Sequence, residues 1–148
     1  MGMSERDYAR ITYDLTMVAA RALLKPNPGM TFIYVSGAGT DSSERGRMMW
    51  ARVKGRTEND LLKLPFKAAY MFRPAFIQPL HGSAPRTRLL KFFYAVLGPL
   101  FPLFRTVLPK YVTTTEQVGR AMLEVAKHDG AKRVLENRDL NDLAGRPS

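Results

Sequence analysis

The chain has no cysteine among its 148 residues, which excludes disulfides and every reaction that depends on a thiolate. A chain without cysteine suits a reducing compartment, so we expect a cytoplasmic protein. Histidine is also scarce: His81 and His128 stand far apart with no acidic cluster beside either one, which argues against a zinc or iron site. The amino terminus, MGMSERDYAR, lacks the apolar stretch of a secretory signal.

Acidic residues are absent between Asp60 and Glu116, where eight lysine and arginine residues fall. The net charge of the whole chain is +10, so most of the positive charge belongs to this segment. A surface of one sign attracts anions, which include nucleotides, nucleic acid and anionic lipid. The aromatic residues here do not alternate with basic ones as on a single-strand nucleic-acid platform, so the sequence disfavours a nucleic-acid partner.

The segment Phe92–Phe104, FFYAVLGPLFPLF, has thirteen residues without charge and contains Pro99 and Pro102. A bilayer span needs about 20 apolar residues, so this segment does not predict one. We interpret residues 78–110 as an apolar and basic lid or substrate-side segment. A second interpretation is a peripheral membrane protein that docks on an anionic membrane surface through residues 86–105.

Helical and strand-like patterns alternate along the chain. Apolar residues at spacings of three and four predict a first helix, which begins after the cap residue Ser4. We expect this apolar stripe to face a sheet; its members are Tyr8, Ile11, Leu15, Val18 and Ala22. Further helices are expected at residues 47–64 and 116–128, and a terminal helical turn at 138–144. Strands are expected at residues 31–36, 67–73 and 132–135, and the first is apolar enough for a central strand buried on both faces. This alternation predicts one α/β domain with a parallel sheet.

The stretch MWARVKGRTEND places Trp50, Lys54 and Glu58 four residues apart, so the three share one helical face. The same spacing occurs in ordinary surface helices through i,i+4 pairing. The loop before it contains Gly37 and Gly39, but Ser42 stands where a dinucleotide fingerprint needs its third glycine. The phosphate-binding loop is therefore not predicted here.

The segments TFIYVSGAG, MWARVKGRTEN, MFRPAFIQP and YVTTTEQVGRAML follow one another in this order. In order and spacing they resemble the second half of an atypical short-chain dehydrogenase/reductase, in the group of nucleoside-diphosphate-sugar epimerase-like and Tat-interacting-protein-like proteins. The resemblance implies an NAD(P)-binding Rossmann fold and a serine working with a Tyr-x-x-x-Lys helix. Here Trp50 stands at the tyrosine position, and an indole N–H cannot titrate as a phenol does.

The resemblance also implies the roles of particular residues. The expected catalytic positions are Ser36, Trp50 and Lys54. The expected NAD or NADP contacts are Lys54, Pro74, Ala75, Phe76 and Ile77. Gln78 and His81 are expected beside a small-molecule substrate of unknown identity. These expectations describe an oxidoreductase or epimerase-like protein, whereas the tryptophan favours a non-catalytic nucleotide-sensing or protein-interaction module.

A Rossmann sheet has two halves, and the glycine-rich loop belongs to the first. Because that loop and the strands before the first helix have no counterpart here, we expect an incomplete Rossmann-type sheet. The chain would then be the carboxy-terminal portion of a longer domain, with Met1 as an internal or alternative start. We expect such a portion to bind NAD or NADP weakly or not at all on its own.

Overall fold

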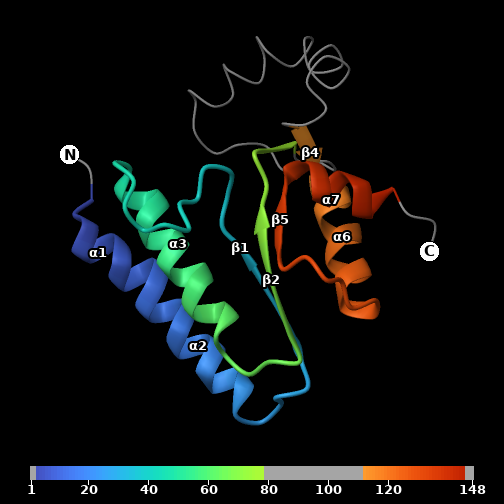
Figure 1. Cartoon of the computed structure of the whole chain (residues 1–148), viewed down its shortest axis with the longest axis horizontal. Helices are drawn as coiled ribbons and strands as arrows, with labels where there is room; N and C mark the ends of the chain where they lie inside the picture. The colour runs from blue at the N-terminus through green and yellow to red at the C-terminus, as the bar shows by residue number, and fades with distance from the viewer. Residues whose placement is uncertain (1–2, 79–111, 146–148) are drawn as a thin grey trace.

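The computed structural model describes residues 3–78 and 112–145, and all structural statements below concern these residues. They form an α/β structure in which helices cover both faces of a small parallel sheet (Figure 1). The strands of this sheet are β1 (Thr31–Val35), β2 (Ala68–Arg73) and β5 (Val134–Glu136), in the order β1-β2-β5. Both neighbouring pairs are parallel, so the predicted α/β class and the three predicted strands are confirmed.

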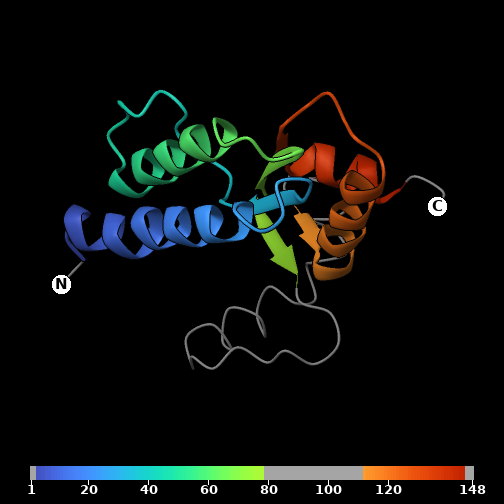
Figure 2. The ribbon, with the colours of Figure 1, turned by 90° about the horizontal axis from the view of Figure 1, so that it is seen from below.

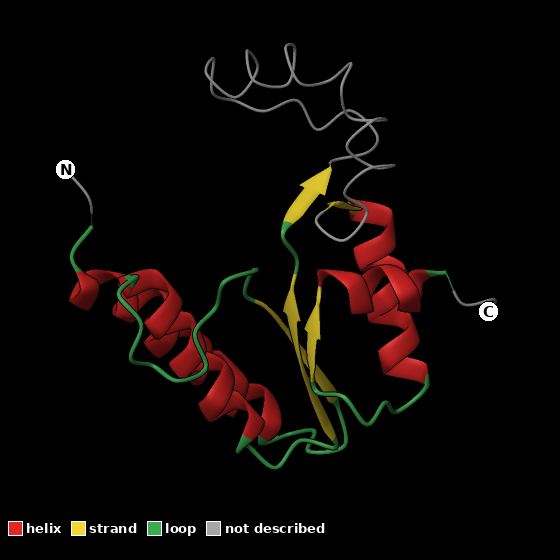
Figure 3. Ribbon diagram, turned by 45° about the horizontal axis from the view of Figure 1, so that its top comes forward, coloured by secondary structure: helices red, strands yellow, loops and turns green. Residues whose placement is uncertain are grey.

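On one face lie the consecutive helices α1 (Glu5–Ala9) and α2 (Leu15–Leu24), joined by a π-helical turn η1 (Arg10–Asp14), together with α3 (Met49–Leu62). On the other face lie α6 (Thr115–Lys127) and α7 (Asn137–Ala144), as Figure 3 shows. Thr114 caps α6 through a complete capping box with Gln117, so local sequence sets where this helix begins. At the carboxyl end, α7 is a full helix where only a helical turn was predicted.

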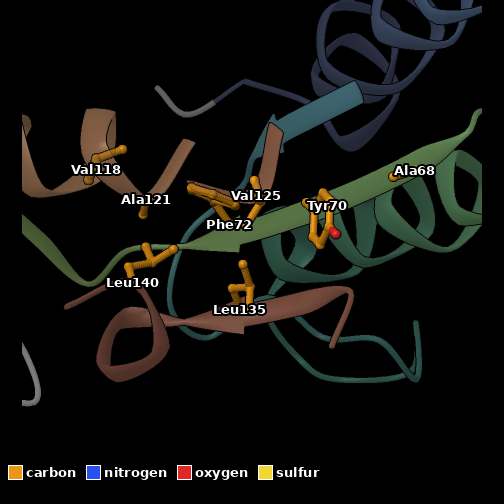
Figure 4. Close-up of a cluster of buried hydrophobic side chains, with 8 residues drawn as sticks. All are labelled: Ala68, Tyr70, Phe72, Val118, Ala121, Val125, Leu135 and Leu140. Atoms are coloured by element: carbon orange, nitrogen blue, oxygen red, sulfur yellow. The ribbon is translucent and has the colours of Figure 1, made fainter. Parts of the chain in front are cut away.

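Strand β2 divides the core into two clusters because its side chains alternate between the two faces. Ala68, Tyr70 and Phe72 point to the α6–α7 side, where they pack with Leu135 and Leu140 (Figure 4). The intervening residues of β2 pack toward α2 and α3, with a cluster that includes Met17, Ala20, Leu61, Ala69 and Met71. All six residues of β2 are buried, so β2 is the central strand.

Two sequence predictions about burial are wrong. The run at residues 31–36 was expected to be buried on both faces, but the side chains of β1 are half-buried or exposed. The apolar stripe of the first helix was expected to face the sheet, but Ile11, Leu15 and Val18 are exposed. The helix buries Met17 and Ala20 instead, because a period of 3.6 residues identifies an apolar face without identifying what covers it.

A second, two-stranded parallel sheet was not predicted. It pairs β3 (Phe76–Gln78) with β4 (Val112–Thr114), so the chain on either side of residues 79–111 returns to one place. Three sequence predictions fall almost entirely outside the described residues: the expected lid at 78–110, the membrane-docking segment at 86–105 and His81. Within the described part, no helix has the length and apolarity that crossing a membrane requires.

Candidate functional site

Lys54 lies at the carboxyl end of the sheet, where the loops after β1 and β2 meet α3. Its ammonium donates a hydrogen bond to the carbonyl oxygen of Ser36, the residue that follows β1. A Cβ atom added to Gly37 would lie 3.8 Å from the Lys54 Nζ and 3.9 Å from the Pro74 carbonyl oxygen. Gly37 therefore lies between the Lys54 ammonium and the end of β2, at the edge where parallel α/β sheets bind ligands.

The loop after β1 depends on glycine at two positions. Gly37 has a φ of +148° and Gly39 a φ of +82°, conformations that other residues rarely adopt. A Cβ on Gly39 would lie 3.3 Å from the Trp50 ring, so the indole packs directly against the loop backbone. The Ala38 amide donates to the Pro74 carbonyl over 2.9 Å, which ties this loop to the end of β2. The glycines therefore serve close packing of loop, strand end and indole.

Helix α3 packs against the same loop at a second close contact. A Cβ on Gly55 would lie only 1.8 Å from the Asp41 carbonyl oxygen, so the loop backbone lies directly on the helix there. The Asp41 carboxylate also accepts hydrogen bonds from the backbone amides of Ser43 and Gly46, at 3.0 and 2.6 Å. The Ser43 hydroxyl, which donates to the same carboxylate, has the largest effect in lowering the pKa of Asp41, and the two backbone hydrogen bonds lower it further.

Ser36 presents its carbonyl oxygen to Lys54 and its hydroxyl to Glu58. The hydroxyl donates to the Glu58 carboxylate and lies 3.2 Å from the Phe72 carbonyl, and the residue is only 7% exposed. Ser36 and Lys54 are therefore adjacent, as the resemblance implied, yet this hydroxyl is engaged inside the protein.

A buried ion pair lies behind the site. Glu58 is 0% exposed, and the Arg73 guanidinium donates to its carboxylate through Nε, 3.1 Å from each oxygen, and through Nη2. Arg73 also reaches Glu136 at 3.1 Å and the Ser42 hydroxyl at 2.5 Å. One guanidinium thus joins β2, α3, β5 and the loop after β1. Sequence reasoning identifies Glu58 and the Arg-Pro ending of β2 separately but does not pair them.

The two cations of the site differ in their electrostatics. Burial lowers the pKa of Lys54, and the attraction of Glu58 opposes this only in part. The hydrogen bond to Glu58 raises the pKa of Arg73. Among the described residues Lys54 takes part in no ion pair, whereas Arg73 has two carboxylate partners. The Lys54 ammonium is therefore a half-buried charge held by a carbonyl, which leaves donors available for a polar ligand.

The expected cofactor contacts after β2 are only partly gathered at Lys54. The Pro74 carbonyl contacts the loop that contains Gly37, which in turn borders the Lys54 ammonium. The amide of Ala75 donates to the Asn137 side chain over 2.9 Å. Phe76 and Ile77 belong to β3 and pair with β4. Gln78, at the end of β3, borders a hollow of about 410 Å³ that is also lined by Thr114, Glu116, Gln117, Arg120, Asn141, Ala144 and Gly145.

A scan of protein-family models gives no match to this chain, and a search of curated proteins gives none either.

Proposed function

We propose that this chain belongs to a Rossmann-type NAD- or NADP-binding protein similar to atypical short-chain dehydrogenases/reductases. In this proposal the nicotinamide ribose binds at the carboxyl ends of β1 and β2, with Lys54 as its main ligand. The observation that carries the proposal is the half-buried Lys54 ammonium, which lies beside Ser36 and Gly37 without an ion pair among the described residues. Leaving this charge partly desolvated is costly, and hydroxyl groups of a ribose would satisfy its remaining donors.

The residues fit one end of the cofactor and not the other. Lys54 offers hydrogen-bond donors, and Gly37 leaves the space in front of them free of a side chain. The loop with Gly37, Gly39 and Ser42 lacks the glycine pattern that binds a pyrophosphate. When bound, the nicotinamide would supply hydride transfer to or from a small-molecule substrate. This chain's residues would position the ribose and pack Trp50 against the glycine loop.

A second candidate is a protein that binds the nucleotide without turning it over. Two observations favour it: Trp50 occupies the position of the titrating phenol, and the Ser36 hydroxyl donates to buried Glu58. Neither group is arranged to pass a proton to a substrate. In this candidate the same site serves as a nucleotide sensor or as part of a protein-interaction surface.

The proposal is tested through the fluorescence of Trp50, the only tryptophan in the chain. Nicotinamide mononucleotide should quench it saturably, whereas adenosine monophosphate, which has the same ribose phosphate, should act at least tenfold more weakly. Lys54→Met should remove the response. Lys63→Met is the matched control, because Lys63 is exposed and pairs with Asp60 near the end of α3. An equal response to both nucleotides, or an unchanged response in Lys54→Met, would refute the proposal.

A further inference from the structure

A hollow lies between α3 and the first helix, which is formed by α1, η1 and α2. The two helices lie side by side in both views (Figures 1 and 2). Two polar contacts join them: Arg52 donates to the Glu5 carboxylate over 2.6 Å, and the Tyr13 hydroxyl donates to Asp60 over 2.7 Å. Between these contacts the small side chain of Ala9 borders a hollow of about 300 Å³. Ligand pockets begin at about this volume, so the hollow has room for a small molecule.

Both carboxylates that border this hollow already have a partner. The lining residues are Glu5, Arg6, Ala9, Tyr13, Glu44, Arg52, Val53 and Arg56. Glu5 forms an ion pair with Arg52, and the Glu44 carboxylate accepts a hydrogen bond from the Asn59 side chain over 2.7 Å. Neither carboxylate is within ion-pair distance of the two remaining arginines in the described part of the chain.

These two arginines, Arg6 and Arg56, take part in no ion pair among the described residues. The Arg56 guanidinium lies over the Tyr13 ring, 4.3 Å from its centroid. Such a contact holds the plane of the guanidinium, whose N–H groups can then donate paired hydrogen bonds to an oxyanion. Two guanidinium groups without a carboxylate partner at one hollow therefore suit an anionic ligand.

We propose that this hollow, which we name the arginine hollow, binds a small phosphate monoester through Arg6 and Arg56. A phosphate monoester carries about −1.5 to −2 charges at pH 7, which matches two guanidinium groups better than the single charge of a carboxylate does. Val53 is buried and Ala9 is half-buried at the same hollow, so its lining also includes apolar surface for the organic group of the ester.

The arginine hollow is separate from the proposed nucleotide site. Each residue turns a helix by about 100°, so residues two positions apart lie on nearly opposite sides. Arg52 and Arg56 border the hollow, whereas Lys54 between them donates to the Ser36 carbonyl oxygen at the end of β1. Variants of one site can therefore be tested with the other site intact.

Isothermal titration calorimetry of the 148-residue chain with phenyl phosphate, in low salt, measures this binding directly. The native chain should bind one equivalent saturably. Arg6→Gln and Arg56→Gln should each weaken binding by about tenfold, because each removes a charge-assisted hydrogen bond. Arg10→Gln is the matched control: Arg10 is an exposed arginine of the first helix that does not border the hollow, and this variant should bind as the native chain does. Circular dichroism should show that all three variants remain folded.

Further variants and ligands test the chemistry of recognition. Arg56→Lys keeps the charge but loses the paired donors, so its affinity should lie between those of the native chain and Arg56→Gln. Glu44→Gln should bind more tightly, because it removes a like charge from the lining. Benzoate, which has the same ring and one charge, and inorganic phosphate, which has no organic group, should both bind more weakly than phenyl phosphate.

Three outcomes would overturn the proposal. The first is that the native chain shows no saturable binding of phenyl phosphate. The second is that Arg10→Gln weakens binding as much as Arg56→Gln, because net charge alone would then explain the loss. The third is that benzoate or inorganic phosphate binds as tightly as phenyl phosphate. None of these outcomes bears on Lys54, so they are distinct from a failure of the proposed nucleotide site.

Discussion

Replacing Arg73 with methionine should destabilise the protein more than removing Glu58, its buried partner. The substitution keeps most of the side-chain volume but leaves the Glu58 carboxylate at 0% exposure, with the Ser36 hydroxyl still donating to it. Removing one partner of a buried ion pair costs about 3–5 kcal/mol, because the other charge remains desolvated. For a chain of this length that loss lowers the Tm by roughly 6–20 °C.

The reverse change should cost less. Glu58→Leu removes the buried carboxylate, and Arg73 keeps Glu136, which is half exposed, and the Ser42 hydroxyl. The double variant Glu58→Leu/Arg73→Met has neither charge, and replacing a buried pair with apolar residues is often neutral or stabilising. We therefore expect the double variant to be more stable than Arg73→Met by about 3 kcal/mol.

Urea denaturation followed by circular dichroism measures all four free energies of unfolding at one pH. The coupling energy of the cycle isolates the interaction between the two side chains, provided that the slopes with urea agree. A loss below about 1 kcal/mol in Arg73→Met would refute the reasoning. Single losses that simply add in the double variant would also refute it, because the two groups would then not depend on each other.

Other positions carry predictions of their own. Gly119→Ala should raise stability by about 1 kcal/mol, because alanine favours the helix and the added Cβ meets nothing within 4 Å; Gly55→Ala should strongly lower the Tm, because its Cβ would lie 1.8 Å from a backbone oxygen. Burial lowers the pKa of Lys54, so acetylation of this lysine, followed by mass spectrometry, should begin at lower pH than acetylation of exposed lysines. The free energy of unfolding should also increase as the pH rises through this lowered pKa, because the unfolded chain then binds more protons than the folded one. In a complete Rossmann domain that contains this chain, a carbonyl panel with NADPH should show weak reductase activity that rises in Trp50→Tyr, because a phenol can relay a proton. Robust turnover with Trp50 in place would mean that another group supplies the proton. If residues 86–105 dock on membranes, the protein should sediment with anionic vesicles and detach in high salt, and equal partitioning with neutral vesicles would contradict this.

Local sequence signals predict most of the described elements. Apolar runs indicate the three strands of the main sheet, and the Thr114–Gln117 box indicates the start of α6. These features depend on residues close together in the chain, where spacing and side-chain chemistry are sufficient. The placement of Lys54 near Ser36 and Pro74 is also predictable, because parallel strands end at one edge of the sheet.

Features that depend on distant contacts are not predictable in this way. The pairing of β3 with β4 joins two three-residue strands, which are too short for a periodic signal. The hydroxyl of Ser36 turns toward Glu58 because that carboxylate is buried beside it, and its burial in turn depends on Arg73. The outward orientation of Leu15 differs from the prediction because the apolar pattern does not specify its partner.

The most direct test of the proposed nucleotide site is the acetylation rate of Lys54 with and without nicotinamide mononucleotide. Mass spectrometry resolves each lysine, so Lys63 serves as an internal control in the same sample. We expect the nucleotide to slow acetylation of Lys54 and to leave Lys63 unchanged, while adenosine monophosphate protects neither. If Lys54 is acetylated at the same rate at every concentration of nicotinamide mononucleotide, the assignment of this lysine as the ribose ligand is wrong.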